Sequence, residues 1–462
     1  MGDRSIRAVP PQIRQSDVDA CPGALRLHAA ADGPLARVRL PGGMLGGSQL
    51  AVLGELAQRW GDGGLELTSR ANVQLRALRE ADPEVLAARL GAAGLLPSPA
   101  HEVVRNIAAP PLAGAGLRAL VHDLDRALCA DPGLAALPGR FLFALGEVPL
   151  AADLAAIPTG SVAIPSGDGV GAAGDGAETP ADDVFAILFA GADLGVRVPA
   201  AGVVTALLAA AHAFLAERAA HHPPAWRLRE LAEGPARVAA RTIGTISDIS
   251  DSYLIVTARG QSAPHGHPGP ATRPAAHDAG ADGRGLVGRL AQPEPPGTAV
   301  GALVPLGRLT RVHLGVLARA DRLVITPWRG VVVPDLAPEA ADRWLRELGE
   351  VGLATGAHSR WVGVTACAGR PGCAKALADV RADAEAAASF VDGLPAHWIG
   401  CARGCGSPSG AHVRVEATAE GYAVSRAPGG DGAGTPAAAP GGERFGGERL
   451  GAVVAARRIH GV

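Results

Sequence analysis

LELTSRANVQL, residues 65–75, and LVITPWRGVVV, residues 323–333, follow one pattern in two distant parts of the chain. In each stretch an apolar run typical of a strand ends at a threonine, Thr68 or Thr326. A short break follows, and a second apolar run predicts a second strand. The two stretches therefore predict two copies of one strand-break-strand unit.

The segments before the two stretches repeat as well. Residues 38–43 predict a strand that runs into a turn, and residues 48–60 predict a helix. Residues 300–306 and 309–318 predict the same order ahead of the second stretch. The sequence therefore predicts a duplicated α+β unit, and chance similarity of two short segments is the alternative.

Four cysteines form two pairs near the C-terminal end, Cys367 with Cys373 and Cys401 with Cys405. Both pairs lie in glycine-containing loops with one arginine each, and tight turns of this kind can direct backbone amides at bound sulfur. The pattern indicates one [4Fe–4S] cluster held by four thiolates. Structural zinc is the alternative, although its cysteine pairs are usually about two to four residues apart. A disulfide framework is disfavoured in so long a chain with six cysteines.

The other features predict structure rather than chemistry. Cys21 and Cys129 lie far from the four clustered cysteines in sequence and are predicted to be small buried thiols. Residues 450–459 predict a C-terminal strand. Three segments rich in glycine, alanine or proline are predicted to be loops or linkers: residues 166–176, 260–296 and 427–442.

The composition predicts a globular protein without a basic surface for nucleic acid. The 462 residues include 43 basic and 45 acidic ones, which give a net charge of −2. Residues 1–7 lack the apolar core of an export signal. Residues 198–216 carry no formal charge, but they are mostly alanine and predict a buried helix rather than a membrane span. We therefore predict a cytoplasmic protein that binds neither nucleic acid nor membrane.

Short motifs spread along the chain resemble the sulfite and nitrite reductase superfamily. They are residues 67–75, residues 103–107, residues 138–141 and the two cysteine loops. Three further motifs are similar to the branch that oxidises precorrins in aerobic cobalamin biosynthesis: residues 20–28, 325–329 and 400–405. The resemblance covers nearly the whole chain apart from the linkers.

The resemblance implies an α+β fold, a pseudo-twofold duplicated nitrite/sulfite reductase-like architecture. Two ferredoxin-like half-domains would pack together, and two larger α+β domains would carry the active site. The expected boundaries are 18–97 for the first half-domain, 98–258 for the first larger domain, 259–297 for a flexible linker, 298–350 for the second half-domain and 351–462 for the second larger domain, which carries the cluster. Because the repeat already supplies pseudo-symmetry, a monomer would suffice.

The resemblance also implies cofactors and site residues. Cys367, Cys373, Cys401 and Cys405 map onto the four ligands of the [4Fe–4S] cluster, and Cys405 onto the one that bridges to sirohaem iron in the reductases. Basic residues over the tetrapyrrole correspond to Arg70, Arg105 and Arg140, which are the implied catalytic residues. A macrocycle derived from uroporphyrin carries many carboxylates, and guanidinium groups bind these bidentately. The implied substrate-binding residues are Arg70, Asn72, Gln74, Arg105, Asn106, Arg140 and Arg329.

One departure from the reductases bears on the reaction. Sulfite reductases that resemble this chain have a lysine-aromatic-lysine triplet where this sequence reads Arg140-Phe141-Leu142. Replacing a cation by an apolar side chain weakens binding of a small dianion and stabilisation of its transition state. The departure therefore favours a reaction other than sulfite reduction.

The implied reaction is the oxygen-dependent conversion of precorrin-3A to precorrin-3B, a hydroxylation at C20 with lactone formation. Its implied partners are the tetrapyrrole substrate, dioxygen and an external electron donor, either a ferredoxin or a flavin reductase. A mononuclear non-haem iron would activate dioxygen. The leading alternative is a sirohaem-dependent nitrite or sulfite reductase, and a non-catalytic tetrapyrrole-binding or zinc-stabilised scaffold is the third.

Overall fold

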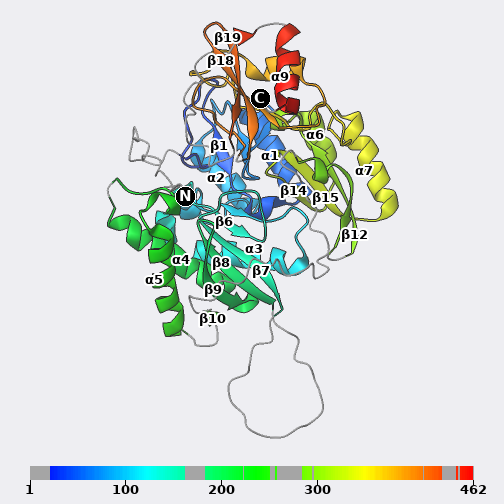
Figure 1. Cartoon of the computed structure of the whole chain (residues 1–462). Coiled ribbons are helices and arrows are strands. Elements are labelled where there is room, and N and C mark those ends of the chain that lie inside the picture. The colour runs from blue at the N-terminus through cyan, green and yellow to red at the C-terminus, as the bar shows by residue number, and fades with distance from the viewer. Residues whose placement is uncertain are drawn as a thin grey trace.

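The computed structural model describes residues 21–161, 183–221, 223–249, 255–256, 283–293, 296–408, 410–428, 444–445 and 448–460. The strands of these residues form four sheets. In Figure 1 the elements α1, β1, β14 and β15 lie between two outer parts of the molecule. One outer part contains β7 to β9 with α4 and α5, and the other contains β18 and β19 with α9.

The central part is built from two copies of one unit. The first copy consists of β1 (Ala36–Val38), the 3₁₀ helix η1 (Pro41–Gly43), β2 (Met44–Leu45), α1 (Gly47–Trp60), β3 (Leu65–Leu67), β4 (Val73–Leu75) and α2 (Pro83–Ala92). The second consists of β12 (Gly297–Leu303), η8 (Pro305–Gly307), β13 (Arg308–Leu309), α6 (Arg311–Leu317), β14 (Leu323–Ile325), β15 (Gly330–Leu336) and α7 (Pro338–Glu350). The order of elements is the same in both, as the duplicated sequence pattern predicts.

The turn after each threonine confirms the register of the repeat. The Thr68 hydroxyl accepts a hydrogen bond from the Asn72 amide at 3.0 Å, and the Thr326 hydroxyl accepts one from the Gly330 amide at 3.0 Å. At the equivalent position of each turn the backbone is left-handed, with φ of 56° at Ala71 and 57° at Arg329. Two turns of identical hydrogen bonding therefore connect β3 to β4 and β14 to β15.

The two copies exchange a short strand. β13 of the second copy pairs with β3 of the first, and β2 of the first copy pairs with β14 of the second. The sheets therefore run β1-β4-β3-β13 and β11-β12-β15-β14-β2, where β11 is Gly288–Gln292. One apolar core contains residues from both copies, including Leu50 of α1 and Leu317 of α6. Neither copy completes its sheet without the other.

The two larger domains also share one topology. The first contains β5 (Ile107–Ala108), α3 (Ala115–Ala130), β6 (Phe143–Leu145), β7 (Leu154–Ser161), β8 (Asp183–Phe189), β9 (Ala192–Pro199), α4 (Val203–Ala219), α5 (Gly234–Ile249) and β10 (Ile255–Val256). The second contains β16 (Val364–Ala366), α8 (Val380–Ala387), β17 (Ala396–Ile399), β18 (His412–Thr418), β19 (Gly421–Ala427), β20 (Arg444–Phe445) and α9 (Glu448–His460). In each sheet the first three strands are parallel and the following ones antiparallel.

The long apolar helix predicted within residues 198–216 is α4. Residues 200–219 have a mean hydropathy of 1.6 and the length of a membrane-spanning helix, and half of this segment is buried inside the protein. Leu207 and Phe214 are fully buried in the core of the first larger domain. α4 packs against α5, α3 and β7, so it is a core helix of this domain.

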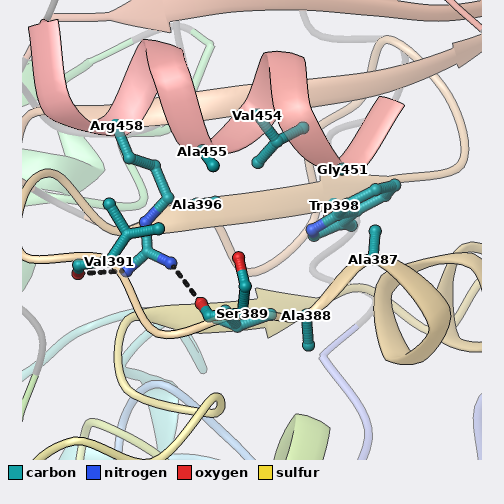
Figure 2. A pocket seen from close by; sticks show the side chains of 11 residues that line it. Ala387, Ala388, Ser389, Val391, Ala396, Trp398, Gly451, Val454, Ala455 and Arg458 are labelled. Atoms are coloured by element: carbon teal, nitrogen blue, oxygen red, sulfur yellow. Dashed lines mark hydrogen bonds between the residues drawn. The ribbon is translucent and has the colours of Figure 1, made fainter. Parts of the chain in front are cut away.

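The predicted C-terminal strand is wrong, because residues 448–460 form the helix α9. Its buried side chains Leu450, Val454 and Arg458 are four residues apart, the spacing of one helix face. Figure 2 shows Val454 and Arg458 pointing from α9 toward β17, beside Trp398. Arg458 is buried and donates to the carbonyl of Leu394 at 2.7 Å and that of Val362 at 2.9 Å. These contacts fix α9 on the sheet of the second larger domain.

The predicted loops and linkers lie largely outside the described residues. This applies to residues 166–176, to most of 427–442 and to most of the linker at 259–297. The last part of that linker is ordered, because Arg284–Leu286 form a 3₁₀ helix and β11 pairs with β12. Leu286 and Leu290 are buried there, and these two apolar side chains explain why the segment joins the sheet.

Candidate functional site

The four clustered cysteines lie in two loops that leave adjacent parallel strands. Cys367 directly follows β16, and one residue separates Cys401 from the end of β17. In the register of the two strands, Ala366 pairs with Trp398. The carboxyl ends of parallel neighbours meet at one edge of a sheet, so both loops start side by side.

The four thiols lie close enough to influence one another. Cys405 is the most exposed of them. Partial desolvation still raises the pKa of its thiol, and the other three cysteines add to the rise. Among the residues that the structure describes, no group of three or more His, Cys, Asp and Glu side chains is arranged to hold a single metal ion. The other three cysteines of the predicted quartet therefore lie within electrostatic range of Cys405, but the described residues do not group them around a single metal ion.

Backbone hydrogen bonds join the two cysteine loops. The Leu377 amide donates to the Gly400 carbonyl at 2.8 Å, and the Cys367 amide donates to the Trp398 carbonyl at 2.9 Å. The Gly400 amide donates to Cys367 Sγ at 3.3 Å, which is the kind of amide-to-sulfur contact expected around a cluster. A Cβ atom at Gly400 would lie 2.6 Å from Cβ of Ala376, so only glycine allows this approach of the loops.

Four arginines, called here the loop arginines, donate to backbone carbonyls of the cysteine loops. Two of them contact residues 367–373: Arg381 Nε lies 3.2 Å from the Cys367 carbonyl and Arg76 Nη2 lies 2.7 Å from that of Gly372. The other two contact residues 401–406: Arg414 Nη2 lies 2.9 Å from the Ala402 carbonyl and Arg329 Nη2 lies 3.1 Å from that of Gly406. These contacts place positive charge beside the thiols and hold the loop backbone. Of the four, sequence reasoning identified only Arg329.

His397 supports the loop that carries Cys405. Its ring lies in β17 and is fully buried, and burial holds the pKa of this histidine well below its usual value. The neutral ring makes two contacts, Nδ1 with the Thr365 hydroxyl at 2.7 Å and Nε2 with the Cys405 carbonyl at 3.0 Å. Because a carbonyl only accepts, Nε2 donates, and Nδ1 accepts from Thr365. A histidine inside the apolar strand just before a cysteine loop was the available signal, and sequence reasoning missed it.

Two of the predicted site arginines, Arg70 and Arg140, lie together. Arg70 Nη1 donates to the Arg140 carbonyl at 3.1 Å. Burial lowers the pKa of Arg70 to about 10, so its guanidinium is still charged at neutral pH. The Arg140 guanidinium lies over the ring of Trp226, 4.8 Å from its centroid, and is exposed. The pair presents two cations from two distant parts of the chain.

The predicted site asparagines connect these segments. Asn72 Nδ2 donates to Asn106 Oδ1 at 3.4 Å, and Asn106 Nδ2 donates to the Gly139 carbonyl at 3.0 Å. Asn72 Oδ1 also accepts from the Leu40 amide at 2.8 Å. Both side chains are buried, so they position the turns that carry Arg70 and Arg140.

Arg105 and Gln74 are placed differently. Arg105 is buried and binds Asp125 bidentately, with both N–O distances 2.7 Å, and donates to the Leu95 carbonyl as well. Gln74 lies half-buried in β4, between Arg37 of β1 and Glu66 of β3 in the register of the sheet. The structure therefore pairs Arg105 with Asp125, and it places Gln74 beside Arg37, which lies within electrostatic range of Arg70.

Arg39 is a site candidate that sequence reasoning missed. It is 2% exposed, and its Nε and Nη2 atoms have no hydrogen-bond partner, whereas Nη1 donates to the Pro22 carbonyl at 3.2 Å. Burial, followed by repulsion from Arg37 and Arg70, lowers the pKa of Arg39 to about 9. The signal was available in the sequence, since Arg37 in β1 and Arg39 directly after it alternate with apolar residues.

Cys21 and Cys129, predicted to be small buried thiols, are half-buried. Cys21 lies within electrostatic range of Arg39 and Arg70. Burial and the nearby Asp125 carboxylate raise the pKa of Cys129 to about 11, so its thiol is protonated at neutral pH.

Known proteins match both the half-domain and the whole chain. The ferredoxin-like half-domain of nitrite and sulfite reductases matches residues 28–93. Ferredoxin–nitrite reductases from Leptolyngbya laminosa and Synechococcus elongatus are 33% and 34% identical, and each match covers 24% of this chain and 24% of the relative. A precorrin-3B synthase from Sinorhizobium sp is 27% identical over 88% of this chain and 82% of its own length. The structure of the NirA protein of Mycobacterium tuberculosis matches with a TM-score of 0.61 at 19% identity, over 85% of this chain and 74% of that chain.

The chain therefore contains a half-domain similar to that of nitrite and sulfite reductases, and it shares the fold of the NirA structure. The match to the two nitrite reductases spans only about a quarter of their length. A relative that is similar over most of both chains is a precorrin-3B synthase.

Proposed function

We propose that this protein is an iron–sulfur oxidoreductase that converts precorrin-3A to precorrin-3B in cobalamin biosynthesis, with hydroxylation at C20 and lactone formation. The observation that carries the proposal is the pair of cysteine loops at one sheet edge, in a chain similar to a precorrin-3B synthase over 88% of its length. Dioxygen is the second substrate, and a ferredoxin or flavin reductase supplies electrons. The protein acts as a cytoplasmic monomer.

The cysteine loops fit a [4Fe–4S] cluster. Four thiols from two glycine-containing loops form the donor set, an amide already points at Cys367 Sγ, and the loop arginines offset the charge of thiolate and sulfide. Cys367, Cys373, Cys401 and Cys405 would hold the cluster. A bound cluster supplies single electrons, and its potential depends on nearby charges, amides and solvent access.

Arg70 and Arg140 are proposed to bind carboxylates of the tetrapyrrole. Their cationic groups come from different segments, so together they fit a substrate with many acidic side chains. Arg39 extends this cationic group, because two of its nitrogens are free to donate. Asn72 and Asn106 position the two turns. Arg329, in the turn between β14 and β15, donates to the loop that carries Cys405 and would lie between the cluster and the substrate.

Gln74 and Arg105 are also proposed to act at the site, Gln74 from β4 and Arg105 by fixing the segment that carries Asn106. The bidentate pair with Asp125 favours this positioning role for Arg105. A mononuclear non-haem iron that activates dioxygen belongs to the proposal as well. Its ligands would be expected near the macrocycle.

The second candidate function is a sirohaem-dependent nitrite or sulfite reductase, in which the tetrapyrrole is a cofactor. Identities of 33% and 34% to two ferredoxin–nitrite reductases favour it. The Arg140-Phe141-Leu142 segment favours the synthase, because Phe141 and Leu142 are both buried in the core. The Leu142 amide is held by Asp153 at 2.9 Å, so this part of the segment faces away from an anionic ligand.

The decisive experiment is incubation of the purified, reconstituted protein with precorrin-3A under labelled dioxygen. We expect one labelled oxygen atom in the product and about four iron and four sulfide per chain. A sirohaem absorbance that persists through gel filtration would instead support the reductase. A product without label would overturn the monooxygenase assignment, and zinc in place of iron would favour a scaffold.

A further inference from the structure

Glu66 occupies a buried position between the two halves of the molecule. It lies in β3 of the first half-domain, and its side chain is 10% exposed. Its Oε1 atom lies 2.6 Å from Arg381 Nη1 of the second larger domain and 3.6 Å from Arg76 Nε. A buried carboxylate is stable only beside cations, and here two arginines from different parts of the chain supply them.

Both of these arginines also contact the first cysteine loop. Arg381 donates from Nε to the Cys367 carbonyl, and Arg76 donates from Nη2 to the Gly372 carbonyl. Glu66 therefore forms ion pairs with both arginines that contact the Cys367–Cys373 loop, one near each end of the loop. Asp32 also binds Arg76 bidentately, with N–O distances of 2.9 Å.

The charge of Glu66 reaches three of the four loop arginines. Burial lowers the pKa of Arg76, but Glu66 and Asp32 together raise it above its usual value. Burial and repulsion from Arg381 lower the pKa of Arg329 to about 10, and Glu66 opposes this fall. The contacts and the electrostatics both identify Glu66 as the carboxylate shared by the cations around the cysteine loops.

We propose that Glu66 is a positioning residue for the Cys367–Cys373 loop and that its negative charge lowers the reduction potential of the cluster. The inference rests on the proposed [4Fe–4S] cluster. A negative charge close to the cluster disfavours the additional electron of the reduced state, whereas a nearby arginine favours it. By holding Arg76 and Arg381, Glu66 also fixes two carbonyl contacts that keep the loop in place.

The test compares Glu66→Gln with Glu66→Asp in the cluster-containing full chain. Glu55→Gln is the matched control, because Glu55 belongs to the same half-domain but lies on its surface, paired with Arg89 at 2.9 Å. Two quantities are measured: the rate at which a chelator removes iron, and the midpoint potential of the cluster by a redox titration followed by electron paramagnetic resonance. For Glu66→Gln we expect iron release several-fold faster and a shift to higher potential. Glu66→Asp and Glu55→Gln should stay close to the unmodified protein.

Arg381→Gln supplies a second, independent variant. It removes a cation from the same network, so the potential should shift to lower values, opposite to the shift of Glu66→Gln. A shift in the same direction for both variants would overturn the electrostatic role. Unchanged iron release and potential in Glu66→Gln, or equal behaviour of Glu66→Asp and Glu66→Gln, would overturn the inference as well. An unmodified protein that binds no iron or sulfide would refute the proposed function itself, and this outcome is visible before any variant is made.

Discussion

The two larger domains have the same sheet edge, but the loops at this edge carry different residues. In the second domain, the loops after the parallel strands β16 and β17 carry the four cysteines, and arginines fasten their carbonyls. In the first domain, the loops after the parallel strands β5 and β6 carry no cysteine. A Cβ atom at Gly146, after β6, would lie 2.8 Å from Leu117 and 3.1 Å from Pro110.

The two larger domains share one topology but differ in the residues that their loops carry at this sheet edge. The carboxyl ends of parallel strands are a common place for ligands because loops converge there. In the first domain Leu117 and Pro110 pack closely around Gly146 at this edge, and Arg118 donates to the Ala113 carbonyl. In the second domain the edge contains four thiols, a backbone amide that donates to Cys367 Sγ, and arginines that donate to loop carbonyls. The duplicated fold therefore provides two equivalent edges, of which the second carries the four cysteines proposed to hold the cluster.

The largest effect is expected from Cys405→Ser in the second edge. A serine hydroxyl is a poor ligand for iron, so the variant should lose the cluster and the activity together. Iron and sulfide content and the visible absorbance measure this loss. Cys129→Ser is the control, because Cys129 lies in α3 beside Asp125, and it should keep full iron content. An intact cluster spectrum in Cys405→Ser contradicts the ligand role.

Gly146→Ala tests the first edge. The added Cβ meets Leu117, and Gly146 has φ of 81°, a conformation that disfavours any side chain. We expect a loss of about 2–3 kcal/mol in the free energy of unfolding, from overpacking and backbone strain together. Urea unfolding of the apoprotein measures the loss, and iron content after reconstitution should match the unmodified protein. If iron binding fell while stability stayed constant, the two edges would not be independent.

Arg70→Ala distinguishes the two copies of the strand-break-strand turn. Arg70 occupies the position that Trp328 has in the second copy, so only the first copy supplies a cation there. We expect about tenfold weaker tetrapyrrole binding, roughly 1.4 kcal/mol, with an unchanged cluster. Binding is followed by titration of the tetrapyrrole absorbance.

Arg105→Ala is the matched comparison for Arg70→Ala. It leaves the Asp125 carboxylate without its bidentate partner in a partly buried place, and it should mainly reduce stability. If Arg70→Ala also lost its cluster, or if its stability fell as much as that of Arg105→Ala, the substrate-binding role of Arg70 would be wrong.

Much of this comparison could be predicted from sequence, because it depends on local patterns. The threonine turns at Thr68 and Thr326 and the spacing of the cysteine pairs are each written within a few residues. The strand exchange could not be predicted, since β2 and β13 have only two residues each and carry no periodic pattern.

Three of the four loop arginines, and Glu66, could not be predicted from the sequence either. Arg76, Arg381 and Arg414 come from different elements, and only tertiary packing brings them to the cysteine loops. The sequence wrongly predicted a strand in place of α9, because Gly451, Ala452, Val453 and Val454 are typical of a strand. The spacing of its buried residues is that of a helix. Long-range polar contacts carry little local signal in a sequence rich in arginine.

The smallest expected effect concerns a helix start that the two half-domains build with different residues. In the first copy, Gln49 Oε1 accepts from the Gly46 amide at 2.9 Å and Nε2 donates to the Ala93 carbonyl at 3.0 Å. In the second copy, His313 Nδ1 accepts from the Thr310 amide at 3.1 Å and Nε2 lies 2.9 Å from the Val351 carbonyl. The imidazole reproduces both contacts of the amide only when it is neutral, with its proton on Nε2.

This replacement makes one of the two helix starts sensitive to pH. Burial lowers the pKa of His313 below its usual value of 6.5. Below pH 6.5 the unfolded chain therefore binds a proton that the folded chain resists, and this part of the stability is lost as the pH falls. His313→Gln copies the first half-domain and should remove that contribution, so that stability falls less between pH 7.5 and pH 5.5, by less than about 1 kcal/mol. Urea midpoints of both proteins at the two pH values measure the difference. Equal pH dependence would show that His313 is protonated in the folded protein as readily as in the unfolded chain, and that the two helix starts differ in sequence but not in electrostatics.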